Sequence, residues 1–151
     1  MRTIAEELPD HPFFAGLGSD ALALVAGCAV NVHARPGEYL FREGESADSF
    51  FVIHEGRVAL EMRRPTGAAV LDTAEQGEVL GWSWLVPPYR WTFDGRAVEH
   101  VRAVRFDGGC LREKCAADPE LGYALLQRIV RVMSSRLHSA RVRLLDLYGA
   151  S

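Results

Sequence analysis

GEYLFREGESADSFFVIHEG, residues 37–56, is the stretch of this 151-residue chain that decides its fold. Two short apolar runs flank a polar turn at Arg42-Glu43-Gly44-Glu45, and a second glycine, Gly56, closes the next run. Glycines at such positions mark turns whose backbone needs a positive φ or a close approach to another segment. The stretch therefore predicts short antiparallel strands joined by tight turns.

The same alternation of short apolar runs and turn residues continues on both sides of this stretch, over residues 30–107. Runs rich in Val, Phe, Ile and Thr alternate with clusters of Gly, Pro, Asp and Glu, which is the pattern of strands and turns. Eight short antiparallel strands favour a mainly β, eight-stranded jelly-roll (double-stranded β-helix). The predicted strands are Asn31–Ala34, Glu38–Phe41, Phe50–His54, Arg57–Met62, Ala69–Ala74, Val79–Gly81, Asp94–Val98 and Val101–Phe106.

Helices are predicted on both sides of the β region. Ser19-Asp20 is a good N-cap for an N-terminal helix. Near the other end, Asp118 is a good N-cap and Pro119 suits the first position of a long helix. No repeat or linker divides the chain, so a single domain over residues 1–151 is expected. The three predicted helices cover residues 19–27, 109–116 and 119–148.

Composition places limits on partners and location. The net charge of −3 argues against a general nucleic-acid binder, which would carry a basic surface. The N-terminus lacks the apolar core of a signal peptide, and the longest apolar run, residues 21–30, is too short to span a membrane. A cytoplasmic protein without a membrane segment is therefore expected.

The three cysteines are Cys28, Cys110 and Cys115, an odd number without a C-x-x-C pair. Cys28 lies in an apolar run and is interpreted as a small buried hydrophobic residue. Cys110 and Cys115 are five residues apart on a predicted helix, so they do not share a face well. Reduced thiols in the cytoplasm are the expectation.

Taken with the strands that follow it, the 37–56 stretch resembles the cyclic nucleotide-binding domain, the β-roll of catabolite activator proteins, kinase regulatory subunits and some ion channels. The resemblance extends from about Phe13 to about Leu147. It implies a non-catalytic regulatory module that signals through its C-terminal helix to an unknown protein partner. It also implies cyclic AMP or cyclic GMP as the ligand, with no cofactor.

In that family a cassette after the sixth strand holds the ligand. A short helix presents backbone N–H groups to the cyclic phosphate, a glutamate after a glycine holds the ribose, and an arginine pairs with the phosphate. Here Gly81 matches the glycine, but Trp82 stands at the glutamate position and Trp91 at the arginine position. Arg90, and less well Arg96, are then the candidate phosphate partners.

All three tryptophans of the chain lie in this cassette. One interpretation is an aromatic pocket for a planar or apolar ligand, with Ser83 and Arg90 as polar groups. The other is that the indoles fill the mouth of the roll, leaving a ligand-free protein-interaction dimer. A void between Trp82, Trp84 and Arg90 would favour the first interpretation. The candidate ligand-binding residues are Gly81, Trp82, Ser83, Trp84, Arg90, Trp91 and Arg96.

The long helix carries a heptad seam spaced 4, 3, 4, 3, 4, 3 along its sequence. Further apolar residues, Leu125, Ile129 and Val132, are displaced to a second side, so one stripe is predicted to cover the roll and the other a second subunit. A single broad stripe on the protein's own core is the alternative. The arginines of this helix are interpreted as a solvated surface. The predicted homodimer seam consists of Leu126, Val130, Met133, Leu137, Ala140, Leu144 and Leu147.

Catalysis and direct DNA binding are not expected. The five histidines are isolated, without the paired histidines of a cupin metal site, and no hydrolase, P-loop or dinucleotide motif is present. Glu43 and Glu45 are interpreted as a solvated hairpin tip. Relatives that regulate transcription continue into a helix-turn-helix module, whereas this sequence ends at Ser151.

Overall fold

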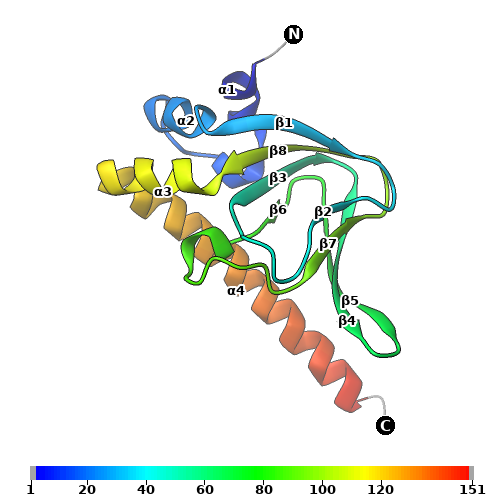
Figure 1. Ribbon diagram of the computed structural model, residues 1–151. Coiled ribbons are helices and arrows are strands. Elements are labelled where there is room, and N and C mark those ends of the chain that lie inside the picture. Colours follow the sequence, from blue (N-terminus) through cyan, green and yellow to red (C-terminus); the bar gives the residue numbers. More distant parts are fainter. Residues whose placement is uncertain (1–2, 150–151) are drawn as a thin grey trace.

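The computed structural model describes residues 3–149, in which a β-roll is flanked by helices at both ends of the chain (Figure 1). The helices are α1 (Ile4–Glu7), α2 (Ser19–Ala26), α3 (Gly108–Ala117) and α4 (Pro119–Gly149), with single 3-10 turns η1 (Leu8–Asp10), η2 (Pro12–Phe14) and η3 (Ser83–Leu85). The strands are β1 (Ala29–Ala34), β2 (Tyr39–Phe41), β3 (Ser49–Glu55), β4 (Arg57–Arg64), β5 (Gly67–Glu75), β6 (Val79–Leu80), β7 (Asp94–Ala97) and β8 (Val101–Asp107). Every predicted strand is present, with ends that differ by at most two residues.

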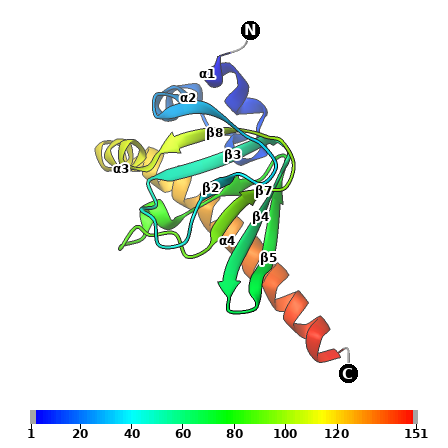
Figure 2. The same cartoon turned by 45° about the vertical axis from the view of Figure 1, so that its right-hand side comes forward.

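The strands form two four-stranded antiparallel sheets, in the orders β1-β8-β3-β6 and β2-β7-β4-β5. The predicted eight-stranded jelly-roll is therefore confirmed. The two sheets share an apolar interior to which Phe41, Phe51, Ile53, Val58 and Leu60 contribute. In Figure 2 the β4–β5 hairpin extends beside the C-terminal half of α4.

A second core lies between the first sheet and the helices. Strand β8 contributes to both cores, because Val101 and Ala103 face the roll interior whereas Val104 and Phe106 pack toward the helices. The alternation of side chains along a strand produces this division. The roll is thereby joined to α2, α3 and the first half of α4 by continuous apolar packing.

The turn glycines of the 37–56 stretch have the predicted backbone conformation. Gly37, Gly44 and Gly56 have φ values of 93°, 87° and 93°, a region that disfavours side chains. A Cβ at Gly56 would lie 2.2 Å from the carbonyl oxygen of His100, whereas a Cβ at Gly37 would meet open space. Gly56 thus serves both the turn and a close approach of two chain segments.

Helix α4 begins as predicted. Asp118 accepts a hydrogen bond from the backbone N–H of Leu121, and Pro119 is the first helical residue. The N-cap of α2 differs by one position from the prediction: it is Gly18, and Ser19 is already helical. No helix between residues 3 and 149 is both long and apolar enough to cross a membrane.

The prediction of a solvated arginine surface on α4 is wrong for Arg128 and Arg136, which are partly buried, whereas Arg143 is exposed as predicted but also contacts the rest of the domain. Arg128 donates to the carbonyl oxygen of Ala15 at 2.9 Å, Arg136 donates to that of Val79, and Arg143 donates to that of Leu71. All three acceptors belong to the roll or to the segment before it. These arginines therefore attach α4 to the rest of the domain, which sequence spacing alone did not reveal.

The prediction of three reduced cysteines is also corrected. Cys28 and Cys110 form a disulfide, with 5.6 Å between their Cα atoms. Because β1 pairs with β8, the residue before β1 lies beside α3, the helix that directly follows β8. Cys115 is free, and burial raises the pKa of its thiol.

Replacing Gly56 with alanine should lower the free energy of unfolding by at least about 3 kcal/mol, because the new Cβ meets His100 in addition to the backbone strain. Gly37→Ala is the matched control, since it has the same φ and open space around its Cβ, and it should cost roughly 1–2 kcal/mol. Urea unfolding of both variants measures the difference. Equal losses would refute the close approach at Gly56.

Candidate functional site

The cassette between β6 and β7 begins at Gly81, whose φ of 96° turns the chain out of β6. The helix that follows, η3, is a single 3-10 turn, and its N-cap, Trp82, makes no side-chain capping bond. Ser83 is the first residue of this turn and is half-buried. The cassette returns to the roll through a bridge between Arg90 and Ser46 and then enters β7.

Trp91 fills the interior of the roll beside the cassette. Its side chain stacks on the ring of Phe41 with 3.7 Å between ring centroids, and only 4% of the residue is exposed. A Cβ at Gly81 would lie 2.7 Å from Cη2 of the Trp91 indole. The indole therefore occupies the space next to the cassette glycine.

Trp84 belongs to the second core rather than to the roll interior. It is 1% exposed, packs near Phe50, and lies so close to Gly108 that a Cβ there would come within 2.9 Å of the Trp84 Cβ. The carbonyl oxygen of Trp84 accepts a hydrogen bond from Arg112 at 2.6 Å. Its role in the structure is to join η3 to α3.

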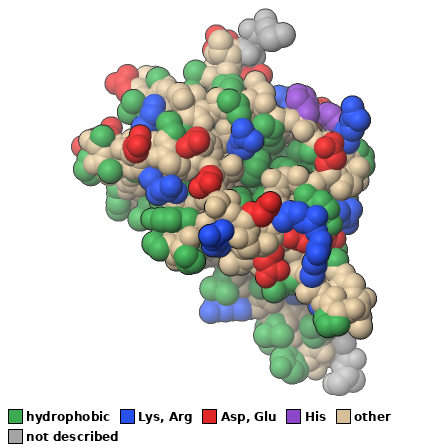
Figure 3. Space-filling view, viewed as in Figure 1, with side chains coloured by type: hydrophobic (Ala, Val, Ile, Leu, Met, Phe, Trp, Pro, Cys, Tyr) green, Lys and Arg blue, Asp and Glu red, His purple; other side chains and the backbone are tan. Residues whose placement is uncertain are grey.

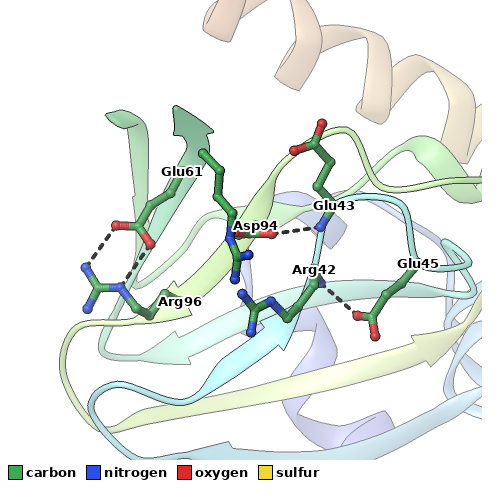
Figure 4. A network of polar contacts seen from close by, with 7 residues as sticks. Arg42, Glu43, Glu45, Glu61, Asp94 and Arg96 are labelled. Carbon is green, nitrogen blue, oxygen red and sulfur yellow. Dashed lines mark hydrogen bonds and ion pairs between the residues drawn. The ribbon is translucent and has the colours of Figure 1, made fainter. Parts of the chain in front are cut away.

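The two candidate phosphate partners make hydrogen bonds to other groups of the fold. Arg90 is exposed and donates to the carbonyl oxygen of Gly44 at 3.1 Å. Arg96 donates two hydrogen bonds to the carboxylate of Glu61, at 2.9 and 3.0 Å (Figure 4). The hydrogen bonding to Glu61 raises the pKa of Arg96. Each guanidinium is therefore hydrogen-bonded within the fold, Arg90 to Gly44 and Arg96 to Glu61.

The Arg42–Glu45 turn is held by polar contacts to the same sheet (Figure 4). Glu45 accepts a hydrogen bond from the backbone N–H of Arg42 at 2.9 Å. Asp94, which is buried, accepts one from the backbone N–H of Glu43 at 2.8 Å. The two glutamates are thus exposed as predicted, but Glu45 also closes the turn.

Of the cassette tryptophans, the half-buried Trp82 borders a cavity. The cavity has a volume of about 470 Å³ and lies between the second sheet and the C-terminal half of α4. The guanidinium of Arg136 lies 5.8 Å from the Trp82 ring centroid. We call this cavity the helix groove; its walls include Leu60, Leu71, Trp82, Phe93, Arg136 and Leu144.

Charged groups lie at one side of the helix groove. Arg136 is half-buried, and this burial lowers its pKa, whereas nearby Asp72 and Glu78 act in the opposite direction. Asp72 forms an ion pair of 3.7 Å with Arg143, which also borders the groove. With two arginines and one aspartate, the groove carries a net positive charge in an otherwise apolar wall.

Sequence reasoning singled out Trp82, but for a cassette pocket with Ser83 and Arg90, neither of which lines the helix groove, and it missed Phe93 and Arg136. Phe93 lies just before β7, outside the aligned cassette, and Arg136 lies more than fifty residues after Trp82. A signal for Arg136 was present: it follows Ile129 and Val132 with helical spacing, so it continues the stripe that docks on the roll. Within residues 3–149, no group of three or more His, Cys, Asp or Glu residues is arranged to hold a metal ion.

A β-roll with a cassette between its sixth and seventh strands, closed by a long C-terminal helix, is the architecture of a regulatory domain. The family model of the cyclic nucleotide-binding domain matches residues 31–118, more than half of the sequence. This chain therefore belongs to the cyclic nucleotide-binding domain family, as its strand pattern predicted.

Individual relatives agree with this assignment. The chain is 28% identical over 135 residues to the CRP-like cAMP-activated global transcriptional regulator of Mycobacterium tuberculosis. The matched region covers 89% of this chain and 58% of the regulator. A putative cyclic nucleotide-binding protein from Geobacter metallireducens has a similar structure, with a TM-score of 0.81, 29% identity, and coverage of 91% of this chain and 100% of that one.

The N-terminal domain of a transcriptional regulator from Streptomyces coelicolor is also similar, with a TM-score of 0.69, 28% identity, and coverage of 87% of this chain and 93% of that domain. This chain spans less than two thirds of the curated M. tuberculosis relative. The shared part is thus a regulatory domain of the cyclic nucleotide-binding type.

Trp91→Ala should lower the free energy of unfolding by about 3–5 kcal/mol, because it removes a fully buried indole and leaves a cavity beside Phe41. Trp82→Ala, at the half-buried cassette tryptophan, should cost less than about 2 kcal/mol. Urea unfolding followed by circular dichroism compares the two variants. A smaller loss for Trp91→Ala than for Trp82→Ala would show that Trp91 does not fill the roll.

Proposed function

We propose that this chain is a non-catalytic regulatory domain that binds a planar or apolar ligand in the helix groove instead of a cyclic nucleotide inside the roll. The observation that carries the proposal is the position of Trp91, whose indole occupies the space beside Gly81. At the glutamate position stands Trp82, which cannot accept a hydrogen bond from a ribose hydroxyl. Neither Trp82 nor Trp91 favours the binding of a sugar phosphate at these positions.

The energetic cost of displacing Trp91 supports this choice. A buried tryptophan covers roughly 150–250 Å², which corresponds to about 4–6 kcal/mol of hydrophobic free energy. Micromolar binding amounts to only about 8 kcal/mol, so displacement would leave an affinity near the millimolar range or weaker. The cyclic phosphate would gain little in return, because Arg96 is already paired with Glu61 and Arg90 is directed to Gly44.

The helix groove offers the features of a small-molecule site. Its volume of about 470 Å³ lies within the usual range for ligand pockets. Trp82 and Phe93 provide aromatic surface, and leucines from both the sheet and α4 provide apolar contacts. Arg136 and Arg143 favour a ligand that carries a negative group beside its planar or apolar body.

A ligand in this groove would act on α4 directly. One wall is the sheet and the other is the helix, through Arg136, Ala140 and Leu144. A molecule that contacts both walls binds the docked arrangement of α4 better than an undocked one, so it shifts the population toward docking. The helix then carries the signal to a second subunit or to an unknown protein partner.

The exposed stripe of α4 is the proposed surface for that output. Leu126, Val130 and Leu137 are each about half exposed, whereas Leu121, Leu125 and Ile129 face the roll and are buried. Hydrophobic side chains also gather on the C-terminal part of this helix (Figure 3). A homodimer through Leu126, Val130, Met133 and Leu137 of the predicted seam would cover the exposed stripe. The other three seam residues, Ala140, Leu144 and Leu147, line the helix groove.

Two expectations stay predictions. The first is that the chain acts through a protein partner instead of direct DNA contact. The chain matches only part of the M. tuberculosis transcriptional regulator, so this similarity does not test that prediction. The second is a cytoplasmic location. The Cys28–Cys110 disulfide does not support it, because disulfides are uncommon in the cytoplasm.

Calorimetry with cyclic AMP and cyclic GMP should give no saturable binding below about 1 mM, because a bound nucleotide would have to displace Trp91.

The planar, apolar anion 1-anilinonaphthalene-8-sulfonate should bind saturably, which its fluorescence measures. Trp82→Ala should weaken that binding roughly tenfold through the loss of an aromatic wall. Tyr123→Ala, an exposed aromatic on α4 outside the groove, is the control and should leave it unchanged.

Micromolar binding of either cyclic nucleotide would overturn the proposal. If Trp82→Ala leaves the affinity for 1-anilinonaphthalene-8-sulfonate unchanged, the helix groove is not the binding site of this probe. Both variants change exposed or half-buried side chains, so circular dichroism should confirm that they fold.

Leu137→Arg should convert a dimer to a monomer on a sizing column, because it places a charge in the middle of the exposed seam. Leu24→Arg, on α2, changes an exposed leucine of the same type away from α4 and should keep the dimer. If the two variants elute alike, the seam is not the subunit interface.

A further inference from the structure

A second cavity lies along α4, and Arg136 lines both this cavity and the helix groove. It has a volume of about 290 Å³ and is enclosed by η2, the β5–β6 turn and α4. The apolar side chains of Pro12, Phe13 and Val132 form part of its wall. We call it the arginine cavity; its polar lining includes Glu78, Arg128, Arg131, Ser135 and Arg136.

The arginine cavity has an unbalanced charge. Three guanidinium groups line it, from residues 128, 131 and 136, which span about 12 Å of the helix axis. Glu78 is the carboxylate in the lining, and one of its oxygens already accepts a hydrogen bond from the backbone N–H of Glu75 at 3.0 Å. The described lining therefore carries a net charge of about +2.

The guanidinium groups also keep unused hydrogen-bond donors. Arg128 donates to the carbonyl oxygens of Ala15 and Ala124, but its Nε is buried and has no acceptor in residues 3–149. Arg136 donates to the carbonyl oxygen of Val79. Among the described residues, no ion pair within 4.0 Å involves Arg128, Arg131 or Arg136. Buried donors without acceptors are unusual in folded proteins, and an anion is the partner that suits a guanidinium best.

We propose that the arginine cavity binds a compact phosphate dianion, of the type of a phosphate monoester. Two negative charges match the charge excess of the lining, and phosphate oxygens accept the fork of N–H groups that each arginine presents. The hydroxyl of Ser135 adds a neutral donor. The apolar wall at Phe13 and Val132 suits the organic group of a monoester.

This site is separate from the ligand of the helix groove, yet Arg136 connects the two. Its guanidinium lies 5.8 Å from the Trp82 ring and lines both cavities. An anion that draws this guanidinium toward the arginine cavity changes the surroundings of Trp82. Phosphate binding should therefore alter tryptophan emission even though no tryptophan lines the arginine cavity.

Calorimetric titration with inorganic phosphate and with phenyl phosphate, at constant ionic strength and with chloride as the reference anion, tests the proposal. Both should bind saturably, phenyl phosphate more tightly because of the apolar wall. Arg131→Gln should weaken both roughly tenfold, which is the effect expected for a lost charge-assisted contact. Arg141→Gln removes an exposed arginine of α4 that does not line the cavity, and it should leave both affinities unchanged.

Trp82→Phe supplies a second measurement. It should abolish the change in tryptophan emission on phosphate binding while calorimetry still gives the wild-type affinity. Absence of saturable phosphate binding, or equal losses in Arg131→Gln and Arg141→Gln, would overturn the proposal, since equal losses indicate general charge screening. Because Arg131 is exposed and makes no described contact within the fold, its glutamine variant should fold normally.

Discussion

The burial of β8 on both faces is the constraint on which the rest of this structure depends. β8 pairs with β1 on one side and with β3 on the other, and its side chains alternate between the roll interior and the helical core. A strand used in this way fixes the distance between the roll and the helices. It also brings Cys28 beside Cys110, and it sets the point where α3 and then α4 leave the roll.

Inside that framework, one buried side chain carries the proposal for the ligand site. Trp91 stacks on Phe41 and fills the space beside Gly81, so the roll interior is a packed core in this chain. The aromatic residues of the cassette therefore differ in position: Trp91 and Trp84 are buried in the two cores, and Trp82 borders the helix groove. Fold and ligand chemistry are separable here, because the roll needs apolar volume whereas a cyclic nucleotide needs specific polar groups.

Helix α4 connects the features that bear on regulation. Its buried stripe docks on the roll, its arginines bond to carbonyl oxygens of the roll, and two cavities lie along it on either side of Arg136. Its exposed stripe is free in the described chain. The two proposed ligands would each act on a different part of this attachment, one on its apolar contacts and the other on its charged groups.

The amino-acid sequence by itself determined the eight strands, the turn at Gly56, the start of α4 at Asp118-Pro119 and the family. These features depend on local rules, namely side-chain alternation, positive φ at glycine and helix capping. The tertiary structure decided which tryptophan is buried, which arginine is paired and where the cavities lie. Trp91, Arg96 and Arg136 each owe their role to a partner far along the chain, Phe41, Glu61 and Val79 respectively, and a partner brought close by folding leaves no periodic signal in the sequence.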